Sequence, residues 1–148
     1  MTRIDFYVLD DEDPGERLRM ACRIIQKAFG LGHRIHVHTG SAGLSGQLDE
    51  ALWTFRDISF IPHEVEGSDP DCPVQICHDR EPDTAGEILV NLDSRVPLFF
   101  SRFERVAEIV NQEPTVRDAG RERYRFYRDR GYDLTHHRLG PPGRNRAS

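Results

Sequence analysis

A run of arginines near the carboxyl end is the part of this chain best suited to bind a ligand. Residues 121–130 hold five arginines and two acids, whereas the whole chain has a formal net charge of −5. Guanidinium groups beside an aromatic ring suit a carboxylate, an acidic peptide or a phosphate chain. Charged helix faces are often only solvated, and the spacing alone leaves both interpretations open. Five side chains of this region fall at i, i+4, i+7, i+8 and i+11 and would share one face of a helix: Arg117, Arg121, Tyr124, Arg125 and Arg128.

An acidic cluster offers a second kind of chemistry. Residues 10–13 are all acidic and follow the first apolar run, and ligands of open α/β sheets bind beyond the carboxyl ends of the strands. Because carboxylates there can hold Mg²⁺, a magnesium-dependent phosphohydrolase using Asp11 and Asp13 is an alternative function. Asp13 followed by Pro14 is also typical of a helix start, and this use of Asp13 as an N-cap argues against a metal site.

The histidines form two close pairs. His36 and His38 alternate along a predicted strand, so their imidazoles share one face, as two ligands of a metal ion would. No acid or thiol lies at a recognisable ligand spacing from them, which favours two exposed or half-buried strand histidines. His136 and His137 lie near the polar end of the chain and are expected to be solvated. We therefore predict no metal ion and no other cofactor.

Three common catalytic and nucleotide-binding motifs are missing from the sequence. It contains no Gly-x-Gly-x-x-Gly, no Gly-x-x-x-x-Gly-Lys-Ser/Thr and no Gly-x-Ser-x-Gly. A fold of the nucleotide-binding type without its phosphate-binding loop indicates a scaffold used for binding rather than for catalysis.

The single tryptophan suggests a possible partner surface. Trp53 lies off the apolar stripe of its predicted helix, and Phe60 and Pro62 follow shortly after it. An exposed apolar patch built from these residues would mark a partner site. The periodicity favours the other interpretation, in which Trp53 folds back onto the core at the end of the helix.

Length and composition indicate one soluble domain. The chain has 148 residues, of which 37% are hydrophobic and 30% charged; we predict a domain over residues 1–139 and a disordered tail over residues 140–148. No apolar run approaches the roughly 20 residues that span a bilayer, and no signal peptide is recognisable, so the expected location is the cytoplasm. Three cysteines at irregular spacing predict free thiols. The negative net charge makes direct binding of single-stranded nucleic acid by the arginines a weaker alternative.

Apolar runs alternate with helical patterns along the chain. The pattern predicts strands at residues 4–9, 34–38, 60–62, 74–77 and 88–92. It predicts helices at residues 14–30, from Ser41 to about residue 55, from Pro97 to Val110, and at residues 116–130. This alternation is typical of a single α/β domain with a mostly parallel sheet flanked by helices on both faces, Rossmann-like but without a nucleotide-binding loop.

Four segments of the sequence together form a specific pattern. In chain order they are Asp5–Leu9, Leu48–Trp53, Phe60–His63 and Arg121–Arg128. Their order and spacing resemble the chi subunit of bacterial DNA polymerase III, a component of the clamp-loader assembly. The resemblance extends to about Leu139 and implies a non-catalytic adaptor with a nucleotide-binding-like fold but no nucleotide chemistry. It also implies two partners: the psi subunit, and the acidic C-terminal tail of single-stranded-DNA-binding protein, which ends in phenylalanine.

The resemblance assigns residues to both partners, and DNA contact is expected to be mainly indirect. Because residues 111–119 look shorter than in the best-known chi, Val110 and Val116 both remain candidates for the apolar residue of the tail pocket. The psi-facing surface could also serve a repair helicase. Four residues match the tail-binding region: Arg121, Tyr124, Arg125 and Arg128. Three match the psi-facing surface: Trp53, Phe60 and Pro62.

Overall fold

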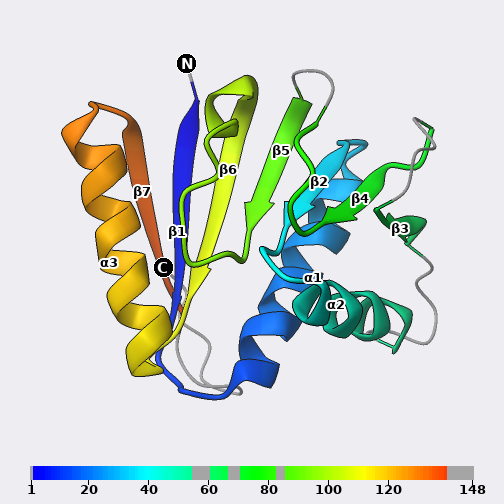
Figure 1. The fold of residues 1–148 in the computed structure, drawn as a ribbon, viewed down its shortest axis with the longest axis horizontal. Helices are drawn as coiled ribbons and strands as arrows, with labels where there is room; N and C mark the ends of the chain where they lie inside the picture. Colours follow the sequence, from blue (N-terminus) through cyan, green and yellow to red (C-terminus); the bar gives the residue numbers. More distant parts are fainter. Residues whose placement is uncertain (1, 55–60, 67–70, 83–85, 140–148) are drawn as a thin grey trace.

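The fold is a single parallel sheet with helices on both faces (Figure 1). The computed structural model describes residues 2–54, 61–66, 71–82 and 86–139. Within these ranges seven strands lie in the order β3-β4-β2-β5-β6-β1-β7, and every neighbouring pair is parallel. The predicted α/β architecture is therefore confirmed. The strands are β1 (Arg3–Leu9), β2 (Ile35–His38), β3 (His63–Val65), β4 (Val74–Cys77), β5 (Gly86–Asn91), β6 (Phe103–Val110) and β7 (Asp133–Leu139).

Helices α1 (Pro14–Gly30) and α2 (Ala42–Thr54) cover one face of the sheet, and α3 (Pro114–Asp129) covers the other (Figure 1). The Asp13 cap expected from the sequence forms, since Asp13 Oδ1 accepts from the Gly15 amide at 2.8 Å. At the start of α2, Ser41 Oγ accepts from the Leu44 amide at 3.1 Å. The core beneath α1 and α2 is mostly aliphatic, whereas the core beneath α3 is rich in aromatic rings.

The helix predicted from Pro97 to Val110 is wrong. A short 3-10 turn (Phe100–Arg102) leads directly into β6, which pairs with β5 on one side and β1 on the other. The apolar spacing that suggested a helix belongs to a strand buried on both faces, where alternation is lost. Phe103, Ala107 and Val110 are all buried in this strand.

Two further strand assignments need correction. The strand expected at residues 60–62 begins at His63, after Pro62, which has no N–H to donate to a ladder; Phe60 lies outside the described residues. The sequence reading also missed β7, which has few apolar residues. Strand β7 is stabilised by its parallel ladder with β1, from Arg3 opposite Asp133 to Leu9 opposite Leu139. In the described ranges, no helix combines the length and apolarity needed to cross a membrane.

Candidate functional site

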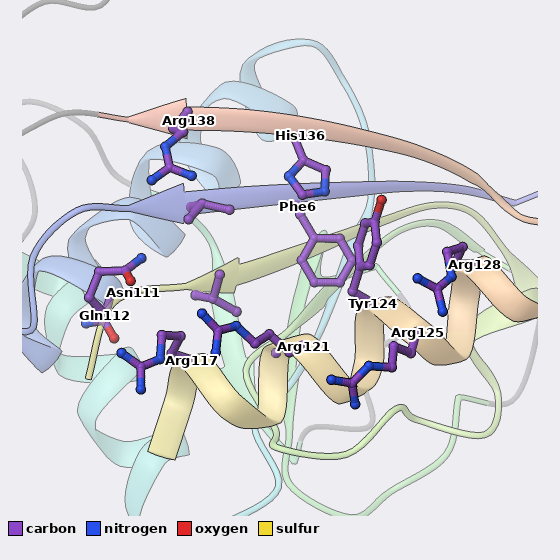
Figure 2. A pocket seen from close by; sticks show the side chains of 13 residues that line it. Phe6, Asn111, Gln112, Arg117, Arg121, Tyr124, Arg125, Arg128, His136 and Arg138 are labelled. Atoms are coloured by element: carbon purple, nitrogen blue, oxygen red, sulfur yellow. The ribbon is translucent and has the colours of Figure 1, made fainter. Parts of the chain in front are cut away.

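A groove of about 350 Å³ lies between α3 and the strands β1 and β7 (Figure 2). Phe6, Val8 and Val110 supply its apolar lining, and the carboxamides of Asn111 and Gln112 lie at one end. Apolar surface next to convergent polar groups is typical of a binding site. This groove can accept a ligand that carries both an apolar group and negative charge.

Helix α3 forms a cationic wall of the groove, as Figure 2 shows. The single face predicted from the spacing is confirmed in the structure. Tyr124 is the aromatic member, and its ring lies 5.5 Å from that of Phe6 and 4.9 Å from that of His136, edge-on to both. All five residues of the predicted stripe line the groove: Arg117, Arg121, Tyr124, Arg125 and Arg128.

The opposite wall comes from β7 and was not foreseen. His136 and Arg138 line the groove from this strand, and the ring of His136 stacks on Phe6 at 6.0 Å. The prediction that His136 and His137 are merely solvated is incomplete, because His137 Nε2 also lies 3.1 Å from the buried Asp5 carboxylate. Apolar and polar residues do not alternate over residues 133–139, so the sequence offered little signal for this strand.

Val110, not Val116, lines the groove. Helix α3 approaches Val110 closely because Gly120 has no side chain: a Cβ atom there would lie 2.7 Å from Val110 Cγ1. Val116 instead belongs to the helix start, where its amide donates to Glu113 Oε2 at 3.0 Å. Of the two candidates left open by the sequence, the geometry favours Val110.

The inner face of α3 is held by a buried ionic network that sequence reasoning missed. Arg123 Nε donates to Glu108 Oε1 at 2.8 Å, and the Tyr127 hydroxyl donates to Glu108 Oε2 at 2.7 Å. Asn91 Nδ2 donates to the same carboxylate at 3.0 Å. Burial, followed by the Glu108 carboxylate, raises the pKa of Tyr127 far above its ordinary value. Arg123 therefore anchors the helix, although in the sequence it looks like one more arginine of the cationic run.

A half-buried arginine of α1, Arg17, lies close to this network. Arg17 Nε donates to the Ile109 carbonyl at 2.8 Å, and its Nη2 donates to the Leu92 carbonyl at 3.0 Å. Burial and then the positive charge of Arg123 lower the pKa of Arg17 to about 10, against the opposing effect of Glu108. Arg17 thus lies at the carboxyl ends of β5 and β6, the edge of the sheet where nucleotide-binding folds place a ligand.

Trp53 lies at the surface on the other side of the sheet. The residue is 56% exposed, so the interpretation that Trp53 folds back onto the core is wrong. Its ring lies 4.8 Å from that of His63, whose two nitrogens face the Ile61 carbonyl at 2.6 Å and Asp49 Oδ1 at 3.1 Å. Pro62 is half-buried beside this group; the third predicted member, Phe60, lies outside the described residues.

Comparisons with known proteins identify the family of this sequence. The family model described as "DNA polymerase III chi subunit, HolC" matches residues 1–135. The chain belongs to the DNA polymerase III chi subunit family. It is 42% identical to DNA polymerase III subunit chi of Pseudomonas aeruginosa over 139 residues, which cover 94% of this chain and 98% of that protein. It is 29% identical to DNA polymerase III subunit chi of Escherichia coli over 141 residues, which cover 90% of this chain and 96% of that protein.

In this chi-family chain, two acids of the cluster at residues 10–13 lie at the start of α1. Asp13 caps the helix, and Asp11 Oδ1 accepts from the Asp13 amide at 3.3 Å. Among the described residues, the acids and histidines that could share an ion are instead Glu66, His78 and Asp79. His78 Nδ1 lies 2.7 Å from Glu66 Oε1 and its Nε2 lies 3.7 Å from Asp79 Oδ1, so each ring nitrogen faces a carboxylate of this group.

His36 and His38 are buried, which corrects the expectation that they are exposed or half-buried. They do share one face, since both rings contact Phe99, at 5.6 Å and 5.5 Å. His38 Nε2 lies 3.1 Å from Asp93 Oδ2. Burial, with smaller contributions from His38 and Arg80, lowers the pKa of His36 to about 4. These histidines are part of the packing of the sheet.

The three cysteines are free thiols, as predicted. Burial is the main cause that raises the pKa of Cys22 and of Cys77 to about 11. A thiol with a raised pKa is a poor nucleophile near neutral pH, because little of it is thiolate.

Proposed function

We propose that this chain is a non-catalytic adaptor of the DNA polymerase III assembly that works in DNA replication in the cytoplasm. Its groove binds the acidic C-terminal tail of single-stranded-DNA-binding protein, and a separate surface binds the psi subunit. Membership of the chi family supports a role as a polymerase subunit. The two partners come from the resemblance of the site residues described above.

One observation carries the tail-binding proposal. A chain with a formal net charge of −5 places four arginines of one helix along an apolar groove. The proposed contacts are guanidinium forks to the carboxylates of the tail, with its terminal ring against Val110, Tyr124 and Phe6. An interface of this kind is small, transient and sensitive to salt.

Titration with a labelled acidic peptide ending in Pro-Phe tests this proposal. We expect saturable binding that weakens with salt and with removal of the terminal Phe. Arg125→Glu should reduce affinity at least about tenfold, because it reverses a charge-assisted contact. Arg23→Glu is the matched control, since Arg23 is exposed on α1 across the sheet. Wild-type protein that does not bind the peptide at low salt would refute the groove as the tail site.

The same titration with a single-stranded oligonucleotide tests direct nucleic-acid binding by the groove. Cations beside an aromatic ring also suit a phosphate backbone with stacked bases. Binding of the oligonucleotide, with none of the peptide, would favour that alternative over the adaptor.

The psi surface is proposed around Trp53, with Pro62 and Phe60. An exposed tryptophan is a frequent anchor of protein interfaces. Trp53→Ala should weaken binding of psi by about thirtyfold, the loss typical of an interface anchor. Leu98→Ala is the control, because Leu98 is 89% exposed elsewhere on the surface. Equal affinity of both variants for psi would place that interface elsewhere.

A further inference from the structure

The arginines that face the groove already contact acids of their own helix. Arg125 Nη1 contacts Glu122 Oε1 one turn earlier in α3. Arg128 Nη2 lies 3.1 Å from Asp129 Oδ1, and its Nε lies 3.2 Å from the same oxygen. A guanidinium forms its strongest contacts when its fork meets a carboxylate in two parallel bonds. An incoming carboxylate that takes the same edge of either guanidinium therefore replaces an internal partner.

The amino-terminal half of the stripe repeats the arrangement. Asp118 Oδ1 lies 3.2 Å from Arg117 Nε and 3.8 Å from Arg121 Nη1. One carboxylate thus serves two arginines of the groove wall. All four arginines that α3 contributes to the groove have an acid of the same helix within contact distance.

Stability of the helix does not explain these acids. The side chains of Asp118, Glu122 and Asp129 are 63%, 67% and 63% exposed, and exposed pairs of this kind contribute little to stability. Asp129 is the last residue of α3, where the negative end of the helix dipole disfavours a carboxylate. The helix is instead held by the buried contacts between Arg123 and Glu108.

We propose that Asp118, Glu122 and Asp129 are internal competitors that occupy the arginines in the free protein and set the affinity of the groove. This inference rests on the proposed function of the groove as the tail site. When a ligand with one carboxylate binds, an arginine exchanges an internal contact for a similar contact with the ligand, and the binding free energy is small. A tail with several acids and an apolar end gains more, because its end also buries surface on the groove lining. The competitors thereby select a multiply acidic tail over isolated acids on other proteins.

The Glu122→Gln variant tests this proposal in the peptide titration. Releasing Arg125 should tighten binding of the acidic peptide about two- to fivefold, the range expected for one exposed ion pair. Glu50→Gln is the matched control, because Glu50 is exposed on α2 across the sheet and its loss changes net charge equally. The gain should disappear in an Arg125→Gln background, since Glu122 then has no Arg125 to occupy.

The outcomes distinguish failure of the competitor role from failure of the proposed tail-binding function. If wild type binds and Glu122→Gln does not bind more tightly, the competitor role is wrong and the tail site stands. A gain that persists in the Arg125→Gln background, or that Glu50→Gln reproduces, is a long-range charge effect and also overturns the inference. If none of these proteins binds the peptide, the proposed function fails and the inference with it.

Discussion

The two sides of α3 carry the same type of ion pair in opposite surroundings. Toward the sheet, the side chains of Arg123 and Glu108 are 3% and 0% exposed. Toward the groove, those of Arg125 and Glu122 are 56% and 67% exposed. A buried charge that loses its partner cannot be compensated by water, whereas an exposed one is solvated at once. The inner pair therefore holds the helix, and the outer pair remains free to exchange partners.

Removing the same charge from each side should produce very different losses of stability. Glu108→Gln leaves the buried Arg123 without a counter-charge and should lower the free energy of unfolding by about 3–5 kcal/mol. Glu122→Gln should change it by less than about 0.5 kcal/mol. Urea unfolding of the two variants measures both values, and equal losses would break the comparison between the sides of α3.

Acid should destabilise the protein through a histidine in its interior. The pKa of His36 is lowered to about 4, mainly by burial, so the unfolded chain binds this proton more readily. The neutral form of His36 contributes to the free energy of unfolding above about pH 6.5, and this contribution is lost as the pH falls toward about 4. The free energy of unfolding decreases by about 3 kcal/mol over this range. Unfolding free energies measured between pH 7 and 4 should show a shallower slope in His36→Gln than in the wild type, and an unchanged slope would contradict this role of His36.

The hydroxyl groups of two tyrosines of α3 should differ least in their effect on stability. Tyr127→Phe deletes the hydroxyl that donates to Glu108 at 2.7 Å and should reduce the free energy of unfolding by about 1–2 kcal/mol. Tyr124→Phe keeps the ring packing on Phe6 and should change it by less than about 0.5 kcal/mol. Chemical unfolding distinguishes the two variants. A larger loss for Tyr124→Phe would mean that the groove side also holds the helix.

Local patterns predicted the features that depend on neighbours in the sequence. The start of α1 follows from Asp13 and Pro14, because a cap and a fixed φ act within one turn. The stripe from Arg117 to Arg128 follows from the helical repeat. Burial of Arg123 does not follow, because it depends on Glu108 in a strand that was itself predicted as a helix.

The sequence by itself determined the parallel α/β class, the caps and the arginine face, since each rests on periodicity or on contacts within a few residues. Only the tertiary structure decided that β6 is a central strand, that β7 forms the second groove wall, and that Val110 rather than Val116 lines the groove. The physical reason is that these features come from pairing and packing between distant segments. Leu134 beside Ile4 and Gly120 beside Val110 are contacts that no local pattern encodes.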